Sequence, residues 1–266
     1  MLICNQINIR VVLSMNLYLK FFILLCIPSV IFSQRNVSDS CISTPWIGVH
    51  YGGNWTSGDL ADRYGFLNHI GGIAGYKTNK NWFWGVEGNF IFGNKVNIPN
   101  LFDALKDSKG NITDMNGDIA RVLLYARGFN ANVSVGKIIP VLSPNKNSGI
   151  FVYAGVGYLL HKMRIETNDQ VVPSIELSYK KGYDRLTIGP NTNQFVGYAF
   201  MANRGFINFY AGFYAQQGFT KNQRDVFFDQ PDVPVSKAWR TDIQIGFKVG
   251  WFIPVYKRQP KEYYYN

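Results

Sequence analysis

The chain has 266 residues, of which 16% are aromatic, 26 are glycine and only 17% are charged. A mean hydropathy of −0.07 excludes a bundle of transmembrane helices, because each such helix needs about 20 consecutive apolar residues. The formal net charge of +10 fits either a solvated excess of basic surface residues or an anionic partner, and in an exported chain we expect that partner to be lipid or lipopolysaccharide phosphate and not nucleic acid.

The N-terminus predicts export, with residues 1–33 as a secretory signal peptide. Lys20 precedes an apolar run, and small Ser33 marks the expected cleavage point. Met15 is the expected true start, so residues 1–14 lie upstream of it. The alternative is an N-terminal membrane anchor, but the apolar run is shorter than a span. Residues 34–45 form an N-terminal segment in which Cys41 stands alone, so we expect no internal disulfide and no zinc site.

Strand signals recur from residue 46 to residue 253. The last is the clearest: every second residue from Trp239 to Ile253 is apolar or Thr, and the charged residues of this stretch lie on the other face. Such alternation predicts a strand between two environments. We expect an extra bulge residue at Gly128, where the alternation shifts. The expected strands cover residues 46–54, 69–77, 82–93, 119–137, 149–161, 193–203, 206–219 and 237–253.

The connections between these strands alternate in length. Long polar segments follow the odd-numbered strands, at residues 55–68, 94–118, 162–192 and 220–236. Short segments follow the even-numbered strands, at residues 78–81, 138–148 and 204–205. Outer-membrane barrels have short periplasmic turns and long extracellular loops. The sequence therefore predicts an all-β, eight-stranded antiparallel up-and-down transmembrane β-barrel in the bacterial outer membrane, with long extracellular loops and a periplasmic tail over residues 254–266.

A soluble lipocalin-like carrier is the alternative, with the same strand number and the apolar faces turned inward. Tryptophans near the strand ends favour lipid contact, since transmembrane barrels carry aromatic girdles at both interfaces; these are Trp82, Trp84, Trp239 and Trp251. The opposite faces mix both charge signs, which suits a filled lumen. The expected lumen network consists of Glu87, Arg121, Arg127, Arg240, Asp242 and Lys248.

An enzyme at the barrel rim is a further alternative. His161 and His69 are expected near the outer rim, with Glu166 close to His161 in sequence, while His50 lies within the first strand. No nucleophile elbow such as G-x-S-x-G appears. We therefore expect no enzyme activity, no catalytic residue, no metal and no cofactor.

The third and fourth long loops carry the strongest hints of a binding function. Basic and aromatic side chains interleave there, which suits phosphate groups or a protein partner, although a solvated loop would look the same. Adjacent exposed phenylalanines in the fourth loop suggest a partner, a membrane rim or a fold-back onto the barrel. The residues concerned are Lys162, Arg164, Tyr179, Lys180, Lys181, Tyr183 and Arg185, with Phe227 and Phe228.

The layout resembles the small OmpA/OmpX-type outer-membrane barrels. The leader ending "FSQ" and the stretches "GVGYLLHKMRIET", "YKKGYDRLTIGPNTNQFVGY" and "GFKVGWFIPVYKR" resemble an outer-membrane barrel family of Bacteroidota. This resemblance spans about residues 46–257, and its motifs indicate no particular reaction or ligand. The family is largely without assigned function. We expect a non-enzymatic structural or accessory subunit of an envelope complex, acting through its loops and tail with another envelope protein. Some small barrels of this phylum are similar in size to accessory proteins of the type IX secretion system.

Overall fold

The computed structural model describes residues 40–176, 179–203 and 207–255. The predicted signal peptide, most of the segment before the first strand and the tail beyond Val255 lie outside the described residues.

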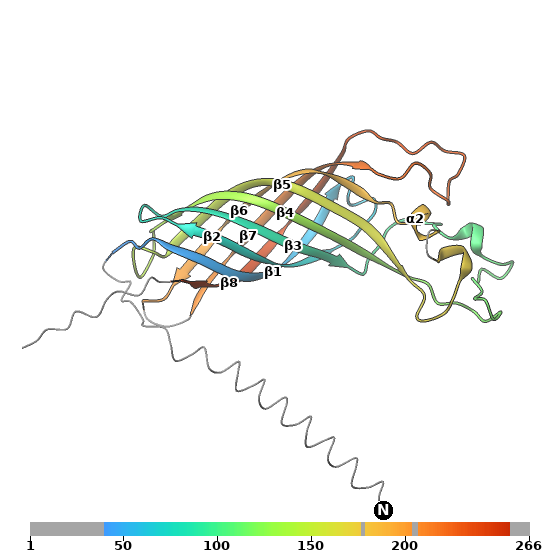
Figure 1. Ribbon diagram of the computed structural model, residues 1–266, viewed down its shortest axis with the longest axis horizontal. Coiled ribbons are helices and arrows are strands. Elements are labelled where there is room, and N and C mark those ends of the chain that lie inside the picture. Colours follow the sequence, from blue (N-terminus) through green and yellow to red (C-terminus); the bar gives the residue numbers. More distant parts are fainter. Residues whose placement is uncertain (1–39, 177–178, 204–206, 256–266) are drawn as a thin grey trace, which may run out of the picture. The chain divides into compact units, whose positions relative to one another are not determined.

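Eight strands form one closed antiparallel barrel in which each strand pairs with its neighbours in sequence and β1 pairs with β8. The predicted all-β, eight-stranded up-and-down barrel is confirmed. Figure 1 shows the strands wrapping around a common axis. The strands are β1 (Thr44–Gly58), β2 (Leu67–Lys77), β3 (Trp82–Gly93), β4 (Leu123–Ile139), β5 (Gly149–Glu166), β6 (Thr187–Met201), β7 (Asn208–Asn222) and β8 (Arg240–Pro254).

The predicted alternation in length holds only in part: the connection after β1 has 8 residues and is shorter than the 9-residue turn between β4 and β5, because β1 continues to Gly58, while the other three connections after odd-numbered strands are long. Loop one (59–66), loop two (94–122), loop three (167–186) and loop four (223–239) gather at one end of the barrel, here called the loop end (Figure 1). Turns at 78–81 and 140–148 lie at the opposite end, the turn end, where β6 ends at Met201 and β7 begins at Asn208. The loops contain the single turns η2 (Asp103–Leu105), η3 (Pro173–Ile175) and α2 (Lys180–Tyr183). Among the described residues, no helix is long and apolar enough to cross a membrane.

Several details of the strands differ from the prediction: β1 ends at Gly58 instead of residue 54, β4 begins at Leu123 instead of residue 119, and β6 begins at Thr187 instead of residue 193. The pairing of β3 with β4 runs without interruption past Gly128, so the expected bulge is wrong. Gly128 faces inward, where an added Cβ would lie 2.8 Å from the carbonyl oxygen of Leu160, so the glycine serves close packing. In addition, β5 continues to Glu166, which places Lys162 and Arg164 on a strand of the barrel wall instead of in a loop.

The outer wall of the barrel is apolar on every strand. One exposed side chain from each of the eight strands illustrates this belt: Val49, Ile70, Val86, Val133, Val156, Val196, Phe213 and Ile245. The lumen, by contrast, holds most of the buried polar and charged side chains. Because side chains alternate between the two faces of a strand, one sequence pattern produces both surfaces.

Candidate functional site

At the turn end, aromatic rings fill the lumen. Trp46 stacks on Phe252 with ring centroids 4.0 Å apart and contacts Phe83 and Phe151 at 5.3 and 5.8 Å. All four side chains are buried. An eight-stranded barrel is just wide enough for side chains to fill its interior, and these four buried rings occupy the lumen at the turn end.

An ion pair occupies the middle of the lumen. Lys248 Nζ lies 3.2 Å from Glu87 Oε2, and neither side chain has any exposed area. The Tyr153 hydroxyl accepts from Lys248 at 3.1 Å and donates to Glu87 at 3.2 Å, while Asn193 donates to the same carboxylate at 2.8 Å. Lys248 also lies 3.8 Å from the ring centroid of Tyr214. The two buried charges therefore have several partners, as charges removed from water require.

Two histidines lie beside this ion pair. His50 donates from Nε2 to the amide oxygen of Asn89 and accepts at Nδ1 from the Tyr210 hydroxyl at 3.0 Å. His69 accepts from Asn54 Nδ2 at 3.0 Å. Gly52 makes room for them, since an added Cβ there would overlap the ring of His69. His69 is thus a lumen residue, and the prediction that it sits at the rim is wrong.

Asp242 organises the loop-end part of the lumen. It accepts hydrogen bonds from His161 Nε2 at 2.9 Å and from the Thr220 hydroxyl. His161 points into the lumen, while Glu166 pairs with Arg164 at 2.7 Å on the outer wall. Although Glu166 is close to His161 in sequence, the two side chains lie on opposite faces of β5 and do not act together.

The geometry around His161 supplies no nucleophile. In the part of the chain that the structure describes, no hydroxyl or thiol is hydrogen-bonded to its imidazole, and the Thr220 hydroxyl is bonded to Asp242 instead. Nucleophilic catalysis requires a base within hydrogen-bond reach of the attacking group. No group of three or more His, Cys, Asp or Glu side chains that could hold a metal ion occurs within the described ranges.

Arg63, from loop one, closes the loop end of the lumen. Its guanidinium donates to the Arg185 carbonyl at 3.1 Å, to Thr187 Oγ1 at 2.7 Å and to Asn222 Oδ1 at 2.7 Å. Burial and the neighbouring Arg240 lower the pKa of Arg63 to about 10. Apolar side chains from loops one, two and three pack over the same opening: Leu60, Tyr64, Leu101, Phe102, Val172, Ile175 and Tyr183.

The six predicted lumen residues fall into two groups. Glu87, Lys248 and Asp242 lie in the lumen, as described above. The other three do not belong to the Glu87–Lys248 network. Arg121 precedes β4 and is exposed in loop two, and Arg127 faces outward because the alternation continues through Gly128. Arg240 lies at the loop-end tip of β8, where its Nη2 donates to the Asp59 carbonyl.

All four predicted girdle tryptophans point away from the barrel interior. Trp82, Trp84 and Trp251 lie toward the turn end, and Trp239 lies at the loop end just before β8. Lys137 and Lys221 place their Nζ atoms 5.2 and 4.1 Å from the ring centroids of Trp82 and Trp239.

Two ion pairs join loops three and four. Arg224 binds Asp184 with both carboxylate oxygens, at 2.9 Å from Nε and 2.6 Å from Nη2. Arg185 pairs with Asp229 at 2.5 Å. The hydrogen bond to Asp184 raises the pKa of Arg224. Two-point contacts of this kind fix relative position as well as adding energy.

Aromatic packing reinforces this contact between loops. Phe227 is buried and lies 3.8 Å, measured to its ring centroid, from the Arg185 guanidinium carbon. Phe228 contacts the rings of Tyr179 and Tyr183 at 6.2 and 5.6 Å. The two phenylalanines therefore pack against loop three and not against the barrel wall, and Phe228 remains 40% exposed.

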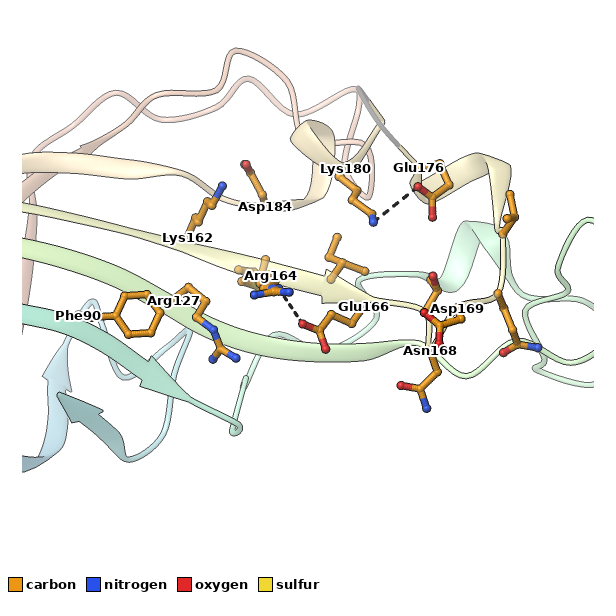
Figure 2. A pocket seen from close by; sticks show the side chains of 15 residues that line it. Phe90, Arg127, Lys162, Arg164, Glu166, Asn168, Asp169, Glu176, Lys180 and Asp184 are labelled. Carbon is orange, nitrogen blue, oxygen red and sulfur yellow. Dashed lines mark ion pairs between the residues drawn. The ribbon is translucent and has the colours of Figure 1, made fainter. Parts of the chain in front are cut away.

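A crevice of about 1190 Å³ lies between the outer wall and loop three (Figure 2). Three acids on its walls already have partners: Glu166 binds Arg164, Glu176 binds Lys180, and Asp184 binds Arg224. Arg127 and Lys162 lie opposite each other on β4 and β5, and neither forms an ion pair within the described residues. Lys181 is exposed on α2.

No protein-family model matches this chain, and no curated protein matches it in sequence. Among solved structures, the N-terminal β-barrel domain of Pseudomonas aeruginosa OprF aligns with a TM-score of 0.33 and 9% identity over 80% of this chain and 100% of that one. Ail of Yersinia pestis aligns with a TM-score of 0.35 and 11% identity over 79% and 97%. The outer membrane protein OprG of P. aeruginosa aligns with a TM-score of 0.34 and 9% identity, over 81% of this chain and 98% of that one. Similarity at this level supports no inference about ligands or partners.

Proposed function

We propose that this protein is an outer-membrane β-barrel that serves as a non-enzymatic structural or accessory subunit of an envelope complex. The observation that carries the proposal is the distribution of side chains: Ile245 is exposed on the outer wall, while Lys248 on the opposite face of β8 has no exposed area. A soluble carrier needs the reverse arrangement, with its apolar side chains around an internal ligand. In this proposal the loop end faces the outside of the cell and the turn end faces the periplasm.

The surface formed by loops three and four is the part proposed to bind a partner. The lumen is filled, so transport through it is not expected, and the loops are tied together by Arg224–Asp184 and Arg185–Asp229. Loops fixed on a rigid scaffold lose little conformational entropy on binding. A secretion-related complex is one candidate for this assembly, since some small barrels of the group that the sequence resembles are similar in size to accessory proteins of type IX secretion.

This role is tested by affinity purification of the barrel from its native envelope after solubilisation in detergent. We expect an envelope protein to co-purify with the wild type and to be lost from the Arg224→Ala/Asp229→Ala double variant, which releases loop four from loop three. Arg164→Ala is the matched control, because it removes the Arg164–Glu166 ion pair at the same end of the barrel. Recovery of the same protein with the double variant would contradict the role of this surface.

A second proposed ligand of the loop end is lipid phosphate, held by Arg127 and Lys162. Like charges directly opposite each other on paired strands are destabilising, and an anion between the two side chains would remove that cost. Phe90 lines the same end of the crevice and belongs to the exposed apolar wall (Figure 2). A phosphorylated lipid could place its chains against Phe90 and its headgroup at the two bases.

The Arg127→Gln/Lys162→Gln double variant is expected to weaken the binding of lipopolysaccharide to the barrel by at least about 100-fold, since two charged hydrogen bonds of about 1.5–3 kcal/mol each are lost. Bound lipopolysaccharide is measured per mole of folded protein. Arg164→Gln should change it little, because Arg164 already has Glu166 as a partner. Equal losses in the two variants would point to general surface charge instead of this site.

A further inference from the structure

A cluster of polar side chains interrupts the apolar outer wall on β6 and β7. Thr192 and Gln194 on β6, and Gln217 on β7, each lie on the outward face and are half-buried. Their neighbours on the same face are apolar, including Val196 and Phe213, which are 51% and 78% exposed. Polar side chains that face lipid are rare in membrane proteins and mark functional surfaces.

The cluster lies at mid-height of the barrel wall. Gln194 is seven residues from each end of β6, counting from Thr187 and from Met201. Apart from tyrosine and tryptophan, the other polar outward side chains on the eight strands lie within four residues of a strand end. These are Ser57, Asn68, Arg127, Lys137, Lys162, Arg164, Glu166, Lys221 and Thr241. The depth of the cluster therefore sets it apart from the polar rims at both ends.

The hydrogen bonds within the cluster satisfy only part of its polar groups. Thr192 Oγ1 donates to Gln217 Oε1 at 2.8 Å, and Gln194 Nε2 donates to Thr192 Oγ1 at 3.4 Å. Among the described residues, nothing is hydrogen-bonded to the Gln194 amide oxygen or to the Gln217 amide nitrogen. Lipid chains offer no partner, and an unpaired amide in an apolar medium costs several kcal/mol.

Small side chains surround the cluster. Gln194 is paired with Ala154 on the neighbouring strand β5 and with Ala215 on the neighbouring strand β7. Small residues at membrane interfaces let two backbones approach closely enough for polar side chains to bond across them. At this position the side chains of the outer wall are therefore small, and several hydrogen-bonding groups lie among them.

We propose that this face, defined by Ala154, Thr192, Gln194, Ala215 and Gln217, binds a second copy of this chain within the membrane. Primary amides are self-complementary, since each offers both donors and an acceptor. Around a two-fold axis, the free amide oxygen of Gln194 in one copy can accept from the free amide nitrogen of Gln217 in the other. The inference rests on the proposed placement of the barrel in a membrane.

Thiol cross-linking in native membranes tests the interface. In a Cys41→Ser background, Ala215→Cys should give a cross-linked dimer with a bifunctional thiol reagent, in at least about tenfold greater yield than Ala74→Cys. Ala74 is the matched control because it is an exposed outward alanine on β2, on another part of the wall. Adding Gln194→Leu and Gln217→Leu to Ala215→Cys should weaken dimerisation by about tenfold while leaving the barrel folded, as expected for the loss of polar contacts between membrane-spanning segments.

Each alternative outcome overturns the inference. Equal cross-linking at positions 215 and 74 would show that no face of the barrel is preferred. A cross-link between Ala215→Cys and a different protein would show that the face binds a different partner. An unchanged yield of dimer after the two leucine substitutions would show that the amides do not hold the dimer together. Recovery of the wild type in the soluble fraction would instead contradict the proposed function itself. The two failures are therefore distinguishable.

Discussion

Replacing Lys248 with methionine is expected to destabilise the folded barrel by about 3–5 kcal/mol, because removal of one partner leaves a buried charge without compensation. Glu87 has no exposed side-chain area, and its remaining hydrogen-bond partners are all neutral, namely Tyr153, Asn193, Asn89 and Asn132. The change is measured as the shift in the free energy of unfolding in lipid vesicles titrated with urea.

The Glu87→Gln/Lys248→Met double variant is the control for this prediction. It removes both charges, and the amide introduced at position 87 keeps the shape and much of the hydrogen bonding of the original carboxylate. Replacing a whole buried ion pair is often close to neutral, so most of the lost stability should return. A single variant as stable as the wild type would show that the pair is not buried in the way described.

Ile245→Arg is expected to cost about 2–4 kcal/mol of barrel stability in a bilayer, the usual penalty for arginine on the lipid face near the midplane. Ile245 is 53% exposed on the outer wall of β8. The free energy of unfolding from vesicles measures the cost. The same substitution at Thr241, which shares the face but lies one residue from the strand end, should cost about 0–1 kcal/mol.

Comparison of the two arginine substitutions shows whether lipid or water surrounds the outer wall of the barrel. If water surrounds the barrel, arginine at either position would be solvated, and neither variant would lose much stability. Equal and small effects at positions 245 and 241 would therefore contradict the lipid-facing assignment.

The architecture was predictable because it depends on local patterns. In β8, Arg240, Asp242 and Lys248 alternate with apolar residues, and two-residue periodicity fixes which side chains share a face. The alternation of long and short connections then gave the order and direction of the strands. Both signals are properties of neighbouring residues, so no knowledge of distant contacts was needed.

The site residues were less predictable because they depend on register across strands. Arg127 was assigned to the lumen through a bulge at Gly128 that the β3–β4 pairing lacks. A one-residue difference in register turns every following side chain to the other face. Arg63 was missed for a related reason: it lies in a loop, and its partners Thr187 and Asn222 are more than 100 residues away.

The polar cluster on the outer wall was missed although its signal is present in the sequence. Gln194 directly follows Asn193 and precedes Phe195, so two consecutive residues are polar. The alternation therefore does not show which of the two polar side chains faces outward. Only the pairing of β6 with β7 shows that Thr192 and Gln217 share the outward side.

Cell fractionation, with the outer-membrane pellet examined on a gel before and after boiling, tests the central claim most directly. A folded barrel in lipid should be recovered in that pellet and should migrate differently when boiled, because the closed sheet resists detergent until it is heated. Recovery in the soluble fraction, with a single heat-independent band, would contradict the account and would make the exposed apolar wall a surface that must be covered by something other than lipid.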